Sequence, residues 1–366
     1  MPEVFFKGAS YRYARLRSAA FEALAAVDRG AISPGSKVLV KPNILTSATP
    51  GQAVTTHPLV IKAACEYALE KGGRVQVSDS TAITSFDRKV RECGIAEALA
   101  GLPVRISELK AARGVPTGGR MGNVDLAEDA LDADVIINLP KLKTHSQMVL
   151  TLAVKNLFGC VPGMKKPEWH YRIGEDTGLF AELLVRIYGI LKPSINLMDA
   201  VLAMEGDGPG TGGTPRPLGV LVASGDALAM DMAVCGMLGL DPEKVPTNKA
   251  ALDLGMPADF KAVGEVPEVR DFKFPAPSDL LFGPRLFHSF TRRHLTARPT
   301  SVPALCGLCG ECEKICPAGA VARRRGKLEF DYDRCIRCYC CLEVCPHGAM
   351  KKEAPVLRKI FAPFLR

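Results

Sequence analysis

The spacing of apolar residues along the first 270 positions predicts alternating strands and helices. Val38 to Asn43 is a short apolar run that ends in polar residues, which is typical of a buried strand. From Leu59 to Lys71 the apolar residues recur with helical spacing, and Gly72 with Gly73 ends the pattern. The same reasoning predicts further strands at 74–79, 134–139, 195–203 and 218–223, and further helices at 179–191 and 226–238.

This alternation predicts the fold class of residues 1–270. Asp226 stands at the expected N-cap of the last helix, where its carboxylate would accept a backbone N–H. Strands that alternate with helices build a sheet with helices packed on its faces. We therefore predict an α/β fold with a mostly parallel sheet covered by helices.

Eight of the 13 cysteines form two copies of the pattern C-x2-C-x2-C-x3-C-P near the C-terminus. This is the ligand run of a bacterial-type ferredoxin, in which the fourth cysteine of each copy binds the other cluster. The spacing predicts a small α+β ferredoxin-like module with two [4Fe–4S] clusters. Cluster 1 would bind Cys306, Cys309, Cys312 and Cys345, and cluster 2 would bind Cys335, Cys338, Cys341 and Cys316.

Other uses of these cysteines fit the pattern less well. Zinc ribbons offer four ligands as two separated pairs, whereas this chain offers two triplets, each with one further cysteine. A disulfide framework would not explain triplets that end at Pro317 and Pro346. Cys340 lies inside the second loop but outside the repeat, so we interpret it as a non-ligand.

The chain of 366 residues is long enough for two or three domains. We expect an α/β domain over 1–270, a proline-rich linker over 271–303, the ferredoxin module over 304–351 and a basic tail over 352–366. The sequence shows no signal peptide and no run of about 18 apolar residues, which predicts no membrane span. Five further cysteines and oxygen-sensitive clusters predict the reducing cytoplasm of an anaerobic or low-oxygen cell.

The net charge of +8 is concentrated near the C-terminus, where residues 285–366 carry 16 Lys and Arg against 7 Asp and Glu. A solvated surface that offsets cluster charge explains this excess. A docking face for an acidic redox donor, such as a ferredoxin or flavodoxin, explains it equally well, because complementary charge speeds association. The sequence argues against nucleic acid as a partner, because the aromatic residues do not alternate with the basic ones as in a stacking platform.

Polar side chains follow three of the predicted strands, at the edge where open α/β sheets bind ligands. The candidate substrate-binding residues are Lys41, Asn43, Asp79, Lys141, Lys143, Lys155 and Asn156, and the candidate proton donors are His57 and His145. Together the lysines favour a small anionic substrate, either a carboxylate or a phosphate, although each lysine alone is equally well a solvated surface residue. Imidazoles, with an ordinary pKa of about 6.5, suit acid–base catalysis. His170 is better explained as a packed loop histidine.

No familiar nucleotide-binding motif in the sequence indicates a further cofactor. Gly208 to Gly213 satisfies G-x-G-x-x-G, but a strand is expected after it where the motif requires a helix, so a rigid turn is the better interpretation. The sequence contains no G-x-x-x-x-G-K-[ST] motif, and nothing in it marks a flavin site.

Four segments of the α/β region resemble the uncharacterised domain family 362 (DUF 362). They are Lys41-Pro-Asn43, Asn138-Leu-Pro-Lys-Leu-Lys-Thr-His145, Ala153-Val-Lys-Asn-Leu-Phe-Gly159 and Met198-Asp-Ala200. Arg298-Pro299 and the second cysteine loop, 335–346, resemble the members of that family that are fused to a ferredoxin domain. The resemblance implies a cytoplasmic iron–sulfur protein and leaves the reaction open.

Two functions fit these observations. In the first, the protein is an oxidoreductase whose clusters feed low-potential electrons to an anionic substrate in the α/β domain. In the second, it is a non-catalytic electron-transfer, redox-sensing or assembly protein, and the α/β domain is a docking platform. The size of the α/β domain favours the first, and the lack of an organic redox cofactor motif favours the second.

Overall fold

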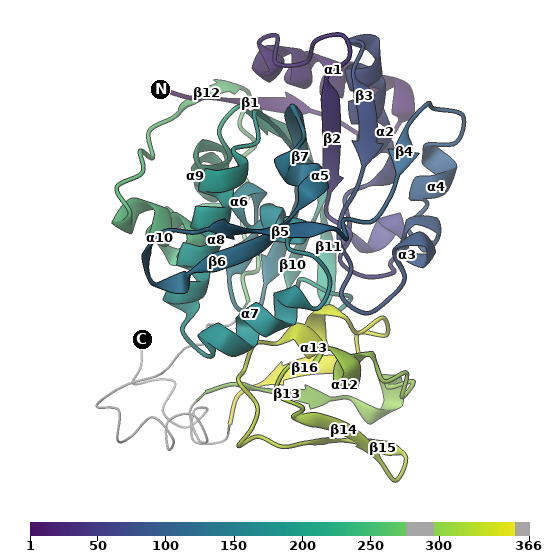
Figure 1. Cartoon of the computed structure of the whole chain (residues 1–366), viewed down its shortest axis with the longest axis vertical. Coiled ribbons are helices and arrows are strands. Elements are labelled where there is room, and N and C mark those ends of the chain that lie inside the picture. Colours follow the sequence, from purple (N-terminus) through teal and green to yellow (C-terminus); the bar gives the residue numbers. More distant parts are fainter. Residues whose placement is uncertain (276–295, 356–366) are drawn as a thin grey trace.

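One mixed sheet forms the centre of the α/β domain (Figure 1). The computed structural model describes residues 1–275 and 296–355, and the segments 276–295 and 356–366 lie outside the described residues. Across the sheet the order is β12, β1, β11, β10, β7, β2, β3, β4, and the β8–β9 hairpin is attached beside β10. The strands are β1 Glu3–Gly8, β2 Lys37–Pro42, β3 Arg74–Val77, β4 Arg105–Ile106, β7 Val135–Leu139, β8 Lys141–His145, β9 Val149–Thr151, β10 Ile195–Gly206, β11 Gly213–Ser224 and β12 Lys261–Gly264.

The sheet contains both parallel and antiparallel pairs. Strands β10, β7, β2, β3 and β4 run parallel to one another, and β12 is parallel to β1, whereas β11 is antiparallel to both β10 and β1. A parallel pair needs a long crossover, but β10 and β11 are joined by a short turn at 207–212, which antiparallel strands allow. The predicted α/β class is therefore confirmed, and the sheet is mixed.

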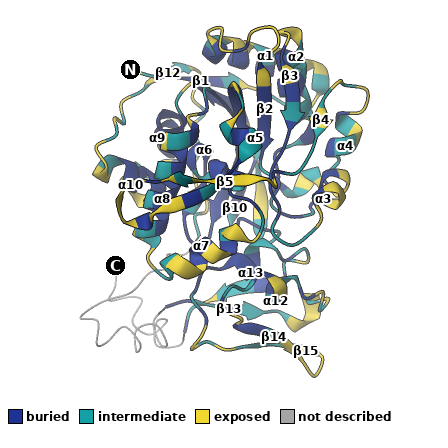
Figure 2. Ribbon diagram, viewed as in Figure 1, coloured by how far each residue is buried: buried dark blue, intermediate teal, exposed yellow. Residues whose placement is uncertain are grey.

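Helices cover both faces of this sheet. The first face carries α1 Tyr13–Asp28, α2 Pro58–Glu70, α3 Phe86–Glu92 and α4 Ile95–Ala98, and the second carries α6 Ala153–Asn156, α8 Thr177–Leu191 and α9 Ala227–Met237. Successive strand residues point to opposite faces, so Val38 and Val40 pack in the first core and Leu39 in the second. Figure 2 shows these central strands buried between the helices.

The predicted helices are confirmed to within two residues at each end. Asp226 caps α9 as expected, because its Oδ1 accepts a hydrogen bond from the Ala229 N–H at 2.8 Å. Strand β11 begins five residues earlier than predicted, since Pro215 and Pro217 argue against a strand in the sequence. In the structure β10 and β11 continue past a bulge as a ribbon that extends beyond the end of β1, so this part of β11 lies at an edge that accommodates those prolines. The segment 208–213 lies at the end of this ribbon, so its interpretation as a turn is confirmed.

The remaining elements of the α/β domain lie around these layers. They are β5 Ala112–Pro116, β6 Asn123–Ala127, α5 Glu128–Leu131, α7 Lys165–Ile173 and α10 Pro246–Asp253. None of the helices within 1–275 and 296–355 is long and apolar enough to cross a membrane.

The cysteine-rich module, residues 298–353, lies against the end of the α/β domain (Figure 1). It contains β13 Arg298–Ser301, α12 Glu311–Ile315, β14 Val321–Arg324, β15 Lys327–Phe330, α13 Cys340–Glu343 and β16 Met350–Glu353. Strands β13 and β16 pair, so both ends of the module are joined, although parts of these strands were expected in the linker and the tail. The rest of that linker and tail, 276–295 and 356–366, lies outside the described residues.

The β10–β11 turn holds this module in place. A Cβ at Gly210 would lie 2.7 Å from the carbonyl oxygen of Leu342, so α13 packs directly on the turn backbone. Thr211 donates a hydrogen bond from Oγ1 to the Cys345 carbonyl at 2.9 Å, and Thr84 donates one to Glu311 at 3.0 Å. The glycine-rich turn is therefore a docking element between the two domains.

We expect Gly210→Ala to loosen this docking. The new methyl group would meet the Leu342 and Glu343 carbonyl oxygens at 2.7 and 3.1 Å, so the module must shift, at a cost of roughly 1–3 kcal/mol. Gly236→Ala in α9 is the matched control, because a methyl group added there would meet no atom within 4 Å. Gly210→Ala should lower the thermal midpoint and speed hydrogen exchange at 340–343, whereas the control should not. Equal exchange in both variants would contradict this role for the turn.

Candidate functional site

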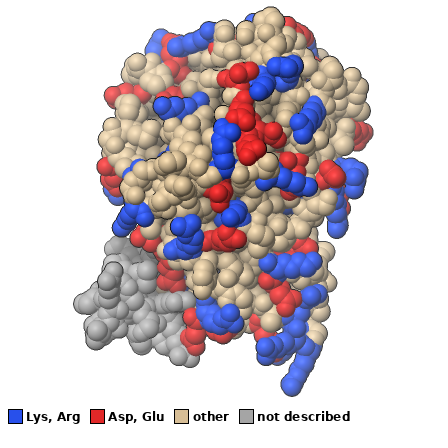
Figure 3. Space-filling view, in the orientation of Figure 1, with Lys and Arg blue, Asp and Glu red and all other residues tan. Residues whose placement is uncertain are grey.

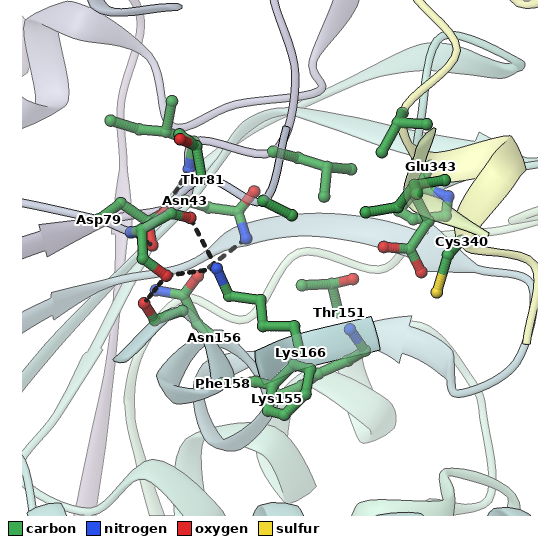
Figure 4. A pocket seen from close by; sticks show the side chains of 18 of the residues that line it. Asn43, Asp79, Thr81, Thr151, Lys155, Asn156, Phe158, Lys166, Cys340 and Glu343 are labelled. Carbon is green, nitrogen blue, oxygen red and sulfur yellow. Dashed lines mark hydrogen bonds between the residues drawn. The ribbon is translucent and has the colours of Figure 1, made fainter. Parts of the chain in front are cut away.

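A cavity lies where the cysteine-rich module meets the carboxyl edge of the parallel strands. In Figure 4 the side chains of Asp79, Asn43 and Asn156 lie on one side, and Glu343 and Cys340 from α13 lie on the other. Both domains therefore contribute to its wall.

Lys41 is fixed by a carboxylate on the sheet side of this cavity. Its side chain is completely buried, and Nζ lies 3.0 Å from Oδ1 of Asp79 and 2.8 Å from the Pro42 carbonyl oxygen. The other carboxylate oxygen of Asp79 accepts the Ile44 N–H at 2.8 Å. Gly159 packs directly on the pair, since a Cβ there would lie 2.3 Å from Asp79 Oδ1. Lys41 and Asp79 are thus bound to each other.

Three more lysines of the cavity are held by uncharged oxygen atoms. Lys143 donates to Oδ1 of Asn43 at 2.9 Å and to the Val54 carbonyl at 2.6 Å. Lys89 donates to the Leu45 carbonyl at 2.8 Å, and Lys166 donates to the Ser80 carbonyl at 2.7 Å. Burial lowers the pKa of Lys143 to about 7, helped by the nearby Lys155, and lowers that of Lys166 to about 8.

Four asparagines form a directed hydrogen-bond chain away from this edge. Asn43 donates to Asn156, Asn156 donates to Asn138, and Asn138 donates to Asn196, at 2.8, 2.8 and 2.9 Å. Each amide in the chain is a donor to the next, so the orientation of all four side chains is fixed. Asn43 is left with its carbonyl oxygen toward the Lys143 ammonium. The predicted pair of Asn43 and Asn156 therefore positions a lysine.

Lys155 differs from the other lysines of the cavity. Its Nζ has no hydrogen-bond or ion-pair partner among residues 1–275 and 296–355. Burial lowers its pKa, and the negative charge of Glu343 opposes that shift without cancelling it. Lys155 is therefore a partly buried cation whose hydrogen-bonding capacity is still available.

His145 faces the cysteine-rich module. Its Nδ1 accepts the N–H groups of Gln147 and Met148 at 3.2 and 3.1 Å, so the neutral ring carries its proton on Nε2. Nε2 lies 2.9 Å from Oε1 of Glu343, an ion-pair distance without the alignment of a good hydrogen bond. Burial lowers the pKa of His145 to about 4. Burial alone would raise the pKa of Glu343, but His145, Lys155 and His170 outweigh it and hold that pKa at about 2.

Two of the predicted site residues lie elsewhere. Lys141 is completely buried, with Nζ 2.7 Å from Oδ2 of Asp199 and 3.0 Å from the Tyr11 hydroxyl. His57 donates its backbone N–H to the same carboxylate at 2.9 Å, and its ring stacks on Tyr11 at 3.6 Å. Neither residue lines the cavity. Of the two lysines in β8, Lys143 contributes to the site and Lys141 does not.

The structure also brings in residues that the sequence had not indicated. They are Ser80, Thr81, Lys89, Thr151, Lys166, His170, Cys340 and Glu343. His170 was expected in a loop, but it lies in α7, packed against Phe158 and Phe180, with one edge on the cavity. Glu343 was missed because it belongs to the module, and no local pattern shows that the module docks at the strand ends.

Four of the repeat cysteines line one small cavity. They are Cys306, Cys309, Cys312 and Cys345, three from the first loop and one from the second. In the second loop, burial and the nearby thiols of Cys338, Cys335, Cys316 and Cys312 raise the pKa of Cys341 well above that of an ordinary thiol.

The backbone around these cysteines suits an anionic cluster. Leu308 and Arg337, at equivalent positions of the two loops, both have positive φ angles, as do Gly310 and Tyr339 two residues later. Left-handed residues in such loops turn successive N–H groups toward one centre, a geometry found at iron–sulfur sites. The Ala320 N–H also lies 3.2 Å from the Cys316 sulfur, where it would stabilise a thiolate ligand.

The comparisons with known proteins agree with this division into two parts. Residues 38–236 match the domain of unknown function DUF362, and residues 305–349 match a 4Fe-4S dicluster domain. The thylakoid-associated protein sll1697 of Synechocystis sp. is 40% identical over 225 residues, which cover 62% of this chain and 70% of that protein.

Two electron-transfer proteins share a shorter region. The electron transport protein HydN of Escherichia coli is 38% identical over 61 residues, 16% of this chain and 35% of HydN. The Frd operon probable iron–sulfur subunit of Proteus vulgaris is 35% identical over 65 residues, 17% of this chain and 41% of that protein. This chain therefore spans less than half the length of either. Among solved structures, the lactate racemase apoprotein of Thermoanaerobacterium thermosaccharolyticum matches 53% of this chain and 49% of its own with 12% identity and a TM-score of 0.37, too low to support any conclusion.

The family match spans more than half of the chain, and the resemblance stated from the sequence is confirmed. The cysteine-rich module is an iron–sulfur electron-transfer domain related to HydN and to the Proteus iron–sulfur protein. The chain therefore belongs to the DUF362 family, in which it combines the family domain with a 4Fe-4S dicluster domain.

Proposed function

We propose that this protein is an iron–sulfur oxidoreductase that exchanges electrons with an anionic molecule bound between its two domains. The observation that carries the proposal is the shared wall of the cavity, to which α13 contributes Cys340 and Glu343. Both residues lie within two positions of Cys341 in the cysteine repeat. If the module only carried electrons, it would not need to form part of the wall of a cavity in the α/β domain.

The charge of the cavity supports an anionic ligand. Among the described residues that line it, five are lysines and two, Asp79 and Glu343, are carboxylates. Buried charges cost free energy unless they are paired, and here one lysine, Lys41, has a carboxylate partner within hydrogen-bond distance. An anion would compensate part of the remaining positive charge and raise the lowered lysine pKa values. We therefore propose a small carboxylate or phosphate as the ligand.

We assign the cluster ligands from the spacing of the two cysteine repeats. Cys306, Cys309, Cys312 and Cys345 would hold cluster 1, and Cys335, Cys338, Cys341 and Cys316 would hold cluster 2, with Cys340 as a non-ligand. When bound, the clusters would supply electrons one at a time. The five cysteines outside the repeat are free thiols, four of them in the α/β domain, which fits a reducing compartment.

The exposure of the cysteines gives the two sites different roles. Cys309 is exposed, so the first site reaches the protein surface. Ile315 and Cys340, which precede Cys316 and Cys341 of the second site, line the cavity. We infer that a redox partner docks beside the first site and that the second site serves the cavity.

His145 is the group best placed to transfer a proton. It lines the cavity, and its two backbone hydrogen bonds fix the tautomer with the proton on Nε2. Reduction of an organic anion by two electrons also requires two protons, and His145 would donate one of them from its imidazolium form, which the adjacent Glu343 carboxylate favours. His57, away from the cavity, has no such role in this proposal.

The surface beside Cys309 suits an acidic electron donor. The β14–β15 hairpin carries Arg323, Arg324, Arg325 and Lys327, and it ends in a turn in which Arg325 and Gly326 both have positive φ, as a type I′ turn requires. Arg323 lies over the first cysteine loop, with Nη1 3.3 Å from the Leu308 carbonyl oxygen. Figure 3 shows basic side chains gathered at the bottom of the molecule, over this hairpin.

Iron analysis tests the ligand assignment. Anaerobically purified protein should contain about eight irons and eight acid-labile sulfides per chain, as two [4Fe–4S] clusters require. Cys338→Ser should lose about half of this iron, whereas Cys340→Ser should keep all of it. Equal loss in the two variants would show that the assignment is wrong.

Charge reversal on the hairpin tests the docking surface. Arg324→Glu combined with Lys327→Glu should slow reduction by a small acidic ferredoxin or flavodoxin about tenfold at low ionic strength, because steering is lost. The difference should shrink as salt rises, since charges are screened over about 8–10 Å near physiological ionic strength.

The control makes the same charge change on the α/β domain. Arg12→Glu with Arg15→Glu, at the start of α1, alters two exposed residues that lie outside the module. It should leave the reduction rate within about twofold of the parent. A rate that is equally slow in both double variants, or independent of salt, would reject a specific docking surface.

A further inference from the structure

We propose that Lys155, Thr151 and His170 form a carboxylate-binding subsite, and that the ligand is an organic monocarboxylate with an apolar body. This inference rests on the proposed function for the site and goes further by naming the class of ligand and the residues that bind it. The three side chains come from α6, β9 and α7. Figure 4 shows Thr151 and Lys155 between the Asp79 side of the cavity and the Glu343 side.

The first argument concerns which lysine ammonium groups of the cavity have no hydrogen-bond partner among the described residues. Lys41, Lys89, Lys143 and Lys166 are satisfied by protein oxygen atoms, so a ligand would have to displace those contacts. Lys155 has no such partner in the described parts of the chain. A ligand would therefore gain the most binding free energy from a contact with Lys155.

The second argument is independent of the lysines. Thr151 and His170 both line the cavity, and the Thr151 hydroxyl and Nδ1 of His170 make no hydrogen bond within the described residues. Thr151 is 3% exposed and His170 is 6% exposed, so bulk water does not readily satisfy them. A buried polar atom without a partner is unfavourable, and such atoms in a native fold indicate a missing ligand or water. Both of these residues line the same cavity as Lys155.

The number of cavity groups without a partner indicates which class of anion would bind. One uncommitted ammonium, one hydroxyl and one imidazole match the single charge and two oxygen atoms of a carboxylate. A phosphate dianion would bring a second negative charge close to Glu343, which is already bound to His145. We therefore expect a carboxylate rather than a phosphate.

The apolar residues that line the cavity indicate the chemical character of the rest of the ligand. Ile44, Leu45, Ile83, Phe158, Ile315 and Val344 line the same cavity. These side chains cannot pair with polar groups, so they favour an apolar or aromatic body. Ile315 and Val344 belong to the module, which places part of that body against α12 and α13.

Isothermal titration of the oxidised, anaerobically purified full chain tests the subsite. The probes are benzoate, cinnamate, acetate, the uncharged benzamide and inorganic phosphate. We expect benzoate and cinnamate to bind at least tenfold more tightly than acetate, benzamide or phosphate. Lys155→Met should weaken binding of the two aromatic acids at least tenfold, because a charged hydrogen bond is lost. Thr151→Val should weaken it about three- to tenfold.

Lys166→Met is the matched control, since it removes a lysine from the same cavity whose ammonium is held by Ser80. Because only the longer-range attraction of this charge is lost, Lys166→Met should weaken binding several-fold less than Lys155→Met does. Iron content and thermal midpoint, measured for every variant, identify any that misfold, and Lys155→Arg then replaces Lys155→Met, with partial retention of binding expected. Phosphate binding as tight as benzoate, equal losses in Lys155→Met and Lys166→Met, or no carboxylate binding at millimolar concentration would overturn the proposal.

The pH dependence of binding adds a second readout. The groups that face Lys155 are Glu343 and Cys340 from α13, Lys143 and His145 from β8, and His170 from α7. Burial lowers the pKa of Lys155 from 10.5, so benzoate affinity should fall as pH rises, beginning below the range of an ordinary lysine. Lys155→Arg, which stays protonated, should show a flatter profile. Affinity that falls identically in both proteins would contradict the role of Lys155.

Titration of oxidised protein separates this inference from the redox function. If benzoate-like acids bind through Lys155 but no bound acid oxidises the reduced clusters, the subsite stands and the oxidoreductase proposal fails. If reduced clusters pass electrons to an acid whose binding is unaffected by Lys155→Met, the redox function stands and the subsite is wrong.

Discussion

The burial of lysine ammonium groups at one edge of the sheet is the constraint on which the rest of this site depends. Lys41 and Lys143 are each 1% exposed or less, so each must find oxygen partners inside the protein. Asp79 binds Lys41, and the asparagine chain orients the carbonyl oxygen of Asn43 that binds Lys143. These contacts fix the β2, β3 and β7 ends relative to one another. The result is a preformed, positively charged wall.

The cysteine-rich module completes this wall. Its helix α13 brings Glu343 to His145 and Cys340 to the cavity, while the glycine turn at 207–212 lets the backbones of the two domains approach closely. Both the positive α/β wall and the electron-transfer module are thus parts of one site. The position of Lys155 follows from this arrangement, because Glu343 lies near enough to act on its pKa yet beyond ion-pair distance.

Local patterns predicted the elements and the cysteine repeat, and they predicted most of the sheet-side residues of the cavity. Lys41, Asn43, Asp79, Lys143, His145, Lys155 and Asn156 all line it, because the ends of parallel strands meet at one edge. Lys141 was misplaced because the sequence does not show that β8 pairs with β10, which places Asp199 beside Lys141. Glu343 and His170 could not be predicted, since their places depend on domain docking and on the packing of α7. The strand at 218–223 was predicted, but its antiparallel pairing with β10 and β1 was not, because local patterns do not show strand direction.

The central claim is that the lysine-lined cavity and one cluster form a single electrostatic unit. The most direct test is to measure the reduction potentials of both clusters in the parent and in Lys155→Met, without added ligand. Net charge close to a cluster helps to set its potential. Loss of this partly buried positive charge should make one cluster harder to reduce and leave the other unchanged, with Lys166→Met giving a smaller shift. Two unchanged potentials would show that the cavity and the clusters are not coupled, and would contradict the account.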